Sequence, residues 1–243
     1  MKIAQEVLEV LNRAECIENR LILTGTLDRK LYMKVNSVLE ECGGKWVSKQ
    51  KAHVFEMNAS DRIEQILLTG EVEIPKDDFD YFPTPSVIVE RLIELADIEP
   101  GMSVLEPEAG QAAISGECLK AGGIVDCYEL SLKNYEVLKT IHPNAILGDF
   151  LQVVPEKKYD RIVMNPPFGK QADIKHVNHA LKFLKTSGRL VSVMASSAEW
   201  RDNKLTNEFR AIVKANGFFE KLPDESFKKS GTLVSTVIAV INN

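Results

Sequence analysis

The residues best suited to chemistry are Asn165, Pro166, Pro167 and Phe168, which follow a buried-strand pattern at residues 159–164. The side-chain oxygen of Asn165 and the carbonyl of Pro166 can both accept hydrogen bonds from the exocyclic NH₂ group of adenine. Two acceptors at a fixed angle favour a more tetrahedral nitrogen, which frees its lone pair for attack on a methyl donor. Proline fixes the backbone that aims one acceptor, and Phe168 offers a face for stacking. Because the same residues also suit an ordinary turn, the interpretation depends on a donor site elsewhere in the chain.

Three earlier strand ends carry residues suited to a donor that contains a nucleoside. In open α/β sheets, ligands bind at the carboxyl ends of the strands. The first strand is followed by a tight turn, residues 106–111, that enters a helix whose N-terminus can face a carboxylate. Glu129, about 20 residues later, can accept hydrogen bonds from two ribose hydroxyls. Asp149 can accept from an adenine amino group, and Phe150 can pack on the ring. Each feature alone also fits a structural role, but the four strand ends together in this order favour a site.

The elements that must position these residues alternate between strand and helix from residue 85 onward. Continuous apolar strands between amphipathic helices predict an α/β fold, with a mostly parallel sheet covered by helices on both faces. The predicted strands are residues 103–105, 124–128, 145–147, 162–164, 188–194 and 233–241. The predicted helices are residues 87–96, one that ends at Lys120, 132–141, 176–184 and 205–215.

The first 70 residues have their own apolar pattern and are predicted to form a small α+β domain. Helical spacing covers residues 1–20, and Asp28 is a suitable N-cap for a helix over residues 29–42. Strands are expected at 20–26 and 52–55, and a second helix at 59–68. The acidic, aperiodic stretch 71–83 is predicted to be a linker, which leaves residues 84–243 as the catalytic domain.

Composition excludes several classes of protein. The chain has 243 residues, a net charge of -5 and a pI of about 5.5, so any nucleic-acid contact must use a local basic face. The four cysteines form no Cys-x-x-Cys pair and the four histidines show no zinc spacing, so we expect reduced thiols and no metal. Without a signal peptide or an apolar run that could span a bilayer, a cytoplasmic protein with no membrane contact is expected.

From residue 81 to residue 243 the chain resembles the class I S-adenosylmethionine-dependent methyltransferases, specifically the type that methylates adenine N6 in DNA. The resemblance rests on Phe82-Pro83-Thr84-Pro85, Leu105 to Ile114, Glu129, Asp149-Phe150 and Asn165 to Phe168. Residues 27–32, 43–46 and 53–55 and the tail 222–232 also resemble phage and prophage methylases.

The resemblance implies a Rossmann-like class I methyltransferase sheet with S-adenosylmethionine as cofactor, and catalytic roles for Asn165, Pro166, Pro167 and Phe168. It implies cofactor contacts from Phe82, Thr84, Pro85, Glu106, Pro107, Ala109, Gly110, Glu129, Leu130, Asp149, Phe150 and Asn165. Two residues depart from the family's first motif, which usually reads Pro-Ser-Ala-Gly-x-Gly. Glu108 replaces the serine and Ala112 the second glycine, so added charge and a Cβ are expected to weaken donor binding.

Basic residues could provide the nucleic-acid contacts. One group with an aromatic residue lies in the first 70 residues: Arg29, Lys30, Lys34, Lys45, Trp46, Lys49 and Lys51. A second group falls near the catalytic loops: Lys170, Lys175, Arg201, Lys204, Lys228 and Lys229. A solvated lysine face and a core Trp46 explain the first group equally well. Phe227 or Trp200 could line a base pocket, or could be structural.

These residues favour a methyltransferase acting on adenine N6 in double-stranded DNA, with the target base flipped out of the stack. Related motifs leave RNA bases and protein amides open as substrates. Glu108 and Ala112 leave open a catalytically weak nucleic-acid-binding protein that retains the fold. A Rossmann dehydrogenase is disfavoured, because the chain lacks the Gly-x-Gly-x-x-Gly pattern.

Overall fold

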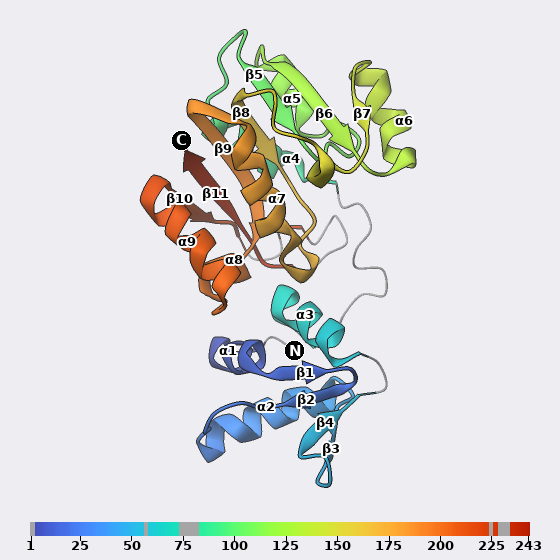
Figure 1. Cartoon of the computed structure of the whole chain (residues 1–243), viewed down its shortest axis with the longest axis vertical. Helices are drawn as coiled ribbons and strands as arrows, with labels where there is room; N and C mark the ends of the chain where they lie inside the picture. Colours follow the sequence, from blue (N-terminus) through green and yellow to red (C-terminus); the bar gives the residue numbers. More distant parts are fainter. Residues whose placement is uncertain (1–2, 56–57, 73–82, 224–225, 228–233) are drawn as a thin grey trace.

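The computed structural model describes residues 3–55, 58–72, 83–223, 226–227 and 234–243, and it contains two sheets (Figure 1). A sheet of four strands lies in the first 72 residues, here called the N-terminal unit. A sheet of seven strands lies in residues 83–243, here called the C-terminal unit. No helix in the described ranges is long and apolar enough to cross a membrane.

The N-terminal unit packs three helices on an antiparallel sheet of order β1-β2-β4-β3. Its elements are α1 (Gln5–Arg13), β1 (Glu15–Ile17), β2 (Arg20–Ile22), α2 (Arg29–Glu41), β3 (Lys45–Val47), β4 (Ala52–Val54) and α3 (Ala59–Thr69). Asp28 caps α2 as predicted, since its side chain accepts from the backbone amides of Lys30 and Leu31. The helix expected over residues 1–20 is wrong in its second half, where β1 pairs with β2.

The C-terminal unit has the strand order β10-β11-β9-β8-β5-β6-β7. Its strands are β5 (Ser103–Glu106), β6 (Ile124–Glu129), β7 (Ile146–Leu147), β8 (Tyr159–Met164), β9 (Leu184–Ala195), β10 (Gly217–Lys221) and β11 (Thr236–Asn242). The pairs among β5 to β9 are parallel, which confirms the mostly parallel sheet. β11 runs antiparallel between β9 and β10, and β10 was not predicted.

Helices cover both faces of this sheet, with α7 on one face and α4 on the other (Figure 1). The α-helices are α4 (Ser86–Ala96), α5 (Ser115–Lys120), α6 (Leu132–Ile141), α7 (Ala172–Ala180), α8 (Ser197–Trp200) and α9 (Lys204–Asn216). Three short 3₁₀ turns join them: η1 (Phe150–Gln152), η2 (Gly169–Gln171) and η3 (Leu181–Phe183).

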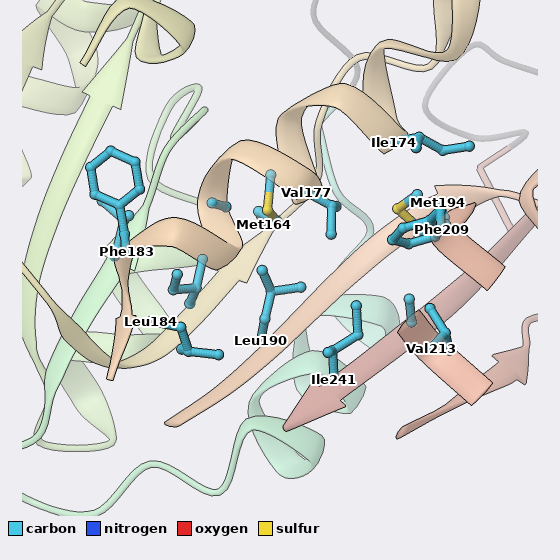
Figure 2. Packing of buried hydrophobic residues seen from close by; sticks show 14 of the residues in the cluster. Met164, Ile174, Val177, Phe183, Leu184, Leu190, Met194, Phe209, Val213 and Ile241 are labelled. Carbon is cyan, nitrogen blue, oxygen red and sulfur yellow. The ribbon is translucent and has the colours of Figure 1, made fainter. Parts of the chain in front are cut away.

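The core that supports β8 lies between the sheet and the helices α7 and α9. Figure 2 shows Val177 of α7 and Phe209 of α9 packed with side chains from the strands. Met164, the last residue of β8, is fully buried there. Because interiors are close-packed, this layer fixes the end of β8 and hence the position of the residue that follows it.

The two units make polar and apolar contacts with each other. Trp200 of α8 packs against the apolar core of the N-terminal unit. Next to it, Arg201 forms an ion pair of 2.8 Å with Glu64 of α3, and the two side chains are only 12% and 9% exposed. Arg201 also donates to Asn12 of α1. These contacts hold α3 against the C-terminal unit.

Candidate active site

A cavity of about 680 Å³ lies where the strands β5, β6 and β8 end. It brings together most of the predicted cofactor and catalytic residues: Thr84, Glu106, Pro107, Ala109, Gly110, Glu129, Leu130, Asp149, Phe150, Asn165, Pro166, Pro167 and Phe168. Pro85 is the exception among the described residues, because it is the N-cap of α4 and does not line the cavity. Phe82 lies outside the described residues.

Asn165 directly follows β8 and offers a free acceptor. Its side-chain Nδ2 donates a hydrogen bond of 3.0 Å to Oγ1 of Thr84. Its Oδ1 is buried and has no hydrogen-bond partner within the described part of the chain. An unpaired buried acceptor is costly unless a ligand satisfies it. The bond to Thr84 therefore fixes the amide so that one oxygen remains free for an NH₂ group in the cavity.

Glu129 is held rigidly at the end of β6. Its Oε2 accepts from the backbone amide of Gly110 at 2.8 Å, and its Oε1 accepts from the amide of Ser131 at 2.7 Å. Since each carboxylate oxygen has two lone pairs, each can still accept a further hydrogen bond. Gly110 adopts a φ of +54°, and this turn brings its amide to Glu129. The carboxylate is thus preorganised to receive two hydroxyl groups.

Asp149 and Phe150 follow β7 at another wall of the cavity. The Oδ1 of Asp149 accepts from the amide of Leu151 at 2.9 Å, which caps η1. The ring of Phe150 is 2% exposed and packs against Tyr128, His179 and Phe183. Phe150 therefore lines the cavity while its ring packs mainly in the supporting core, and its predicted stacking on a cofactor ring stays a prediction.

A histidine that the sequence did not single out faces Glu108 in the cavity. Nδ1 of His176 on α7 lies 2.5 Å from Oε1 of Glu108, and both side chains are mostly buried. Oε2 of Glu108 is buried without a partner in the described residues. Burial raises the pKa of Glu108, and the hydrogen bond from His176 opposes that rise. No local signal connects the two residues, because 68 positions separate them in sequence.

The two departures from the expected glycine-containing turn have different outcomes. Ala112 adopts a φ of +71°, a left-handed conformation that disfavours a Cβ. Its methyl group nevertheless packs with Ala109, Cys127 and Leu138, and Ala112 does not line the cavity. The expected crowding of the donor by this Cβ therefore has no support in the geometry. Glu108, by contrast, does line the cavity.

Glu106 ends β5 and anchors the next helix. Its Oε2 accepts from the backbone amide of Ser115, the first residue of α5, at 2.7 Å. Burial raises the pKa of Glu106 well above its ordinary value. Glu106 lines the cavity, but its hydrogen bond serves the start of the helix.

The predicted basic group of the N-terminal unit is divided in the structure. Arg29 and Lys30 begin α2, whereas the β3–β4 hairpin follows the end of that helix, about 18 Å away. The hairpin carries Lys45, Trp46, Lys49 and Lys51. Trp46 is 47% exposed and contacts His53, so it is not a core residue. The hairpin alone keeps an aromatic residue among lysines, while Lys34 pairs with Glu6.

Several residues expected near the catalytic loops serve the contact between the units. Arg201 pairs with Glu64 and Lys170 with Asp61, at 2.8 Å and 2.9 Å, so the phosphate contacts predicted for them compete with protein partners. Trp200 packs in the N-terminal core and does not line the cavity, which corrects its suggested role as a pocket wall. Among the other residues predicted near the catalytic loops, Lys175 is exposed and Lys204 lies 4.0 Å from Glu208. Phe227 lines the cavity, as suggested for a pocket residue. Lys228 and Lys229 lie outside the described residues.

Comparisons with known proteins agree with this geometry. The family described as methyltransferase small domain matches residues 125–219. An rRNA methyltransferase of Streptomyces thermotolerans is 34% identical over 91 residues, which cover 35% of this chain and 30% of that protein.

Two solved structures share the fold. One is a Vibrio vulnificus YJ016 protein assigned as the modification subunit of a type I restriction enzyme, with a TM-score of 0.57 and 17% identity. The match covers 69% of this chain and 45% of that one. The other is a Listeria monocytogenes protein assigned to the class I S-adenosylmethionine-dependent methyltransferases, with a TM-score of 0.55 and 15% identity. This match covers 98% of this chain and 79% of that chain. The chain spans less than half the length of the rRNA methyltransferase and of the modification subunit.

The free acceptor of Asn165 and the fixed carboxylate of Glu129 fit a bound nucleoside donor. The C-terminal unit has the class I methyltransferase fold, part of it matches a methyltransferase family, and S-adenosylmethionine is the cofactor that this family and fold indicate.

Proposed function

We propose that this protein transfers a methyl group from S-adenosylmethionine to the N6 amino group of adenine in DNA. The observation that carries the proposal is the buried, unpaired Oδ1 of Asn165, fixed by Thr84 at the end of the catalytic strand. Glu129 and Asp149 line the same cavity and offer acceptors for the ribose and the adenine of the cofactor.

Bound S-adenosylmethionine supplies an electrophilic methyl group on its sulfonium. Asn165 and Pro166 accept hydrogen bonds from the two N–H groups of the target amine and orient its lone pair toward the methyl donor. Phe168 stacks on the target base, which must leave the duplex because N6 is otherwise paired. No strong general base is needed, since the nitrogen becomes acidic once it is alkylated. Positioning and hydrogen-bond geometry supply most of the rate enhancement.

The choice of DNA rests on the Asn-Pro-Pro-Phe motif and on the structural similarity to a restriction-modification subunit. The β3–β4 hairpin, with three lysines and an exposed Trp46, suits contact with a nucleic-acid backbone. The similarity to an rRNA methyltransferase favours RNA adenine as the second candidate substrate.

The test is methyl transfer from isotope-labelled S-adenosylmethionine into unmodified duplex DNA and, in parallel, into RNA. Nucleosides from the digested product are identified by mass spectrometry. We expect labelled N6-methyladenine in DNA from the wild type, and a loss of at least about 100-fold in Asn165→Ala, the size of effect seen when one preorganised hydrogen-bonding group is removed. Cofactor affinity should stay within about twofold, because Oδ1 serves the acceptor base.

Asn144→Ala is the matched control, since Asn144 is exposed and lies before β7, away from the cavity lining. If the label appeared only in RNA, RNA adenine would replace DNA adenine as the proposed substrate. Undiminished transfer by Asn165→Ala would remove the catalytic role from this residue.

A further inference from the structure

One wall of the cavity comes from the N-terminal unit. Gln65, Leu68 and Thr69 of α3 line it together with the catalytic residues. No sequence pattern indicates this, because α3 precedes Asn165 by about a hundred positions and belongs to the other sheet. The N-terminal unit therefore contributes side chains to the site itself.

This wall is fixed at the end of the cavity where the catalytic loop lies. Lys170 of η2, two residues after Phe168, pairs with Asp61 of α3 at 2.9 Å, and α3 packs against η2. Glu64, the neighbour of Gln65, forms the mostly buried ion pair with Arg201. Removing one partner would leave an unpaired buried charge, so this pair fixes how α3 docks on the C-terminal unit. Gln65 is thus held beside the methyl-acceptor end.

Gln65 is the residue of this wall whose polar group is free. The hydroxyl of Thr69 donates to the carbonyls of Gln65 and Glu71, at 3.0 Å and 3.2 Å. Leu68 is apolar and 5% exposed. The side-chain amide of Gln65 has no hydrogen-bond partner among the residues that the structure describes, and it is partly exposed to the cavity. It can therefore donate to a ligand.

The chemistry of the target base calls for such a donor. When Asn165 and Pro166 accept hydrogen bonds from the N6 amino group, the edges of adenine still present the ring nitrogens N1 and N7, which are acceptors. In duplex DNA a glutamine amide pairs with adenine through N6 and N7, and its NH₂ group is the donor to N7. We propose that Gln65 donates from its Nε2 to a ring nitrogen of the target adenine and so contributes to base selection. This inference rests on the proposed function of the site.

The experiment compares wild type, Gln65→Ala, Gln65→Glu and Gln5→Ala on a duplex that contains a site mapped from the wild-type product. Gln5 is the exposed first residue of α1 and serves as the matched control. We expect Gln65→Ala to lower kcat/KM about 10- to 100-fold, the range for removing one good hydrogen bond to a base, with cofactor Kd unchanged within about twofold. Gln65→Glu should lower it further, because a carboxylate facing a ring acceptor repels it.

Substrates with 7-deazaadenine or 1-deazaadenine at the target position separate base contact from a structural role. The analogue that lacks the contacted ring nitrogen should lower the wild-type rate. It should leave the rate of Gln65→Ala unchanged, since this variant cannot form the hydrogen bond with adenine or with the analogue. Full activity in Gln65→Ala would overturn the role of Gln65 and leave the proposed function standing. The same would follow if each analogue lowered the rate of the wild type and of Gln65→Ala by the same factor. A weakened cofactor Kd would assign Gln65 to the donor end and likewise overturn it. Inactivity of the wild type and of Gln5→Ala on all adenine substrates, with cofactor bound, would instead reject the proposed function, and this inference with it.

Discussion

At the scale of single residues, the cavity is notable for its four carboxyl groups. Glu106, Glu108, Glu129 and Asp149 all line it. After burial, the remaining carboxylates contribute to raising the pKa of Glu106 and Glu108. A raised pKa favours the neutral form of a carboxyl group, so the field depends on the carboxylates that stay ionised. Ionised carboxylates attract a cation such as the sulfonium of S-adenosylmethionine, whereas the product S-adenosylhomocysteine does not carry that charge. We therefore expect the cavity to bind the substrate more tightly than the product.

Glu108→Gln tests this electrostatic preference. The amide oxygen can still accept from His176, but the negative charge is removed. We expect the ratio of the Kd of S-adenosylhomocysteine to that of S-adenosylmethionine to fall about three- to tenfold, which corresponds to about 1 kcal/mol, the attraction between two unit charges about 4 Å apart in water. Calorimetric titration measures both constants, and Glu136→Gln on the exposed face of α6 is the control. An equal change for both ligands would show that Glu108 acts only through packing.

Sequence patterns predicted the residues whose roles follow from strand ends. Asn165, Glu129 and Asp149 each directly follow a strand of a parallel sheet, or nearly so, and these ends meet at one edge. His176 and Gln65 could not be found this way. They lie on helices, and which helical residues face a cavity depends on how the helices dock, which no single helix pattern contains.

At the scale of elements, the loop between β8 and α7 is anchored by Asp173 at the start of α7. Its Oδ1 accepts from the amide of Ile174, and its Oδ2 accepts from the amide of Ala195 at the end of β9. Burial raises the pKa of Asp173 to about 7, while these amides and Arg201 act in the opposite direction. The loop after Asn165 is thus tied to β9 through a carboxyl group that titrates near neutrality.

This titration predicts a pH dependence of stability. Between about pH 4 and pH 7 the folded chain keeps a proton on Asp173 that the unfolded chain has released, so this residue's contribution to stability falls as pH rises. Asp173→Asn cannot titrate, and its deficit relative to wild type should shrink between about pH 5 and pH 8. Urea unfolding at both pH values measures the difference, with exposed Asp202→Asn as control. A deficit that grows with pH would contradict the raised pKa.

The best-predicted element is a long helix, and three of the short strands were missed. The periodicity over residues 132–141 gives the bounds of α6 as observed. The strands β1, β3 and β10 have three to five residues, too few for an alternating pattern to stand out. The final strand was expected, but its antiparallel direction between β9 and β10 depends on long-range pairing that an apolar run does not encode.

At the scale of the whole molecule, a net charge of -5 opposes a polyanionic partner, so local lysines must provide the attraction. The β3–β4 hairpin lies at the end of the N-terminal unit away from the C-terminal unit (Figure 1). Its lysines have no ion-pair partner within the described ranges. This leaves the hairpin free to contact phosphates.

Replacing Lys49 and Lys51 together with alanine should weaken duplex DNA binding at all sequences. For each phosphate that the protein no longer neutralises, the slope of log K against log salt concentration should fall in magnitude by about 1. Fluorescence anisotropy over a salt series measures the slope, and Lys214→Ala on the exposed side of α9 is the control. An unchanged slope in the double variant would assign DNA binding to another surface.

Trp200 belongs to the C-terminal unit by sequence but, partly buried, packs against the core of the N-terminal unit. A recombination event that exchanged residues 3–72 for another small domain would therefore leave this indole without the apolar surface that it contacts. We expect the two units to be inherited together or to change together at this contact. Relatives that keep the sheet but carry a different N-terminal unit should have a different residue at the position of Trp200.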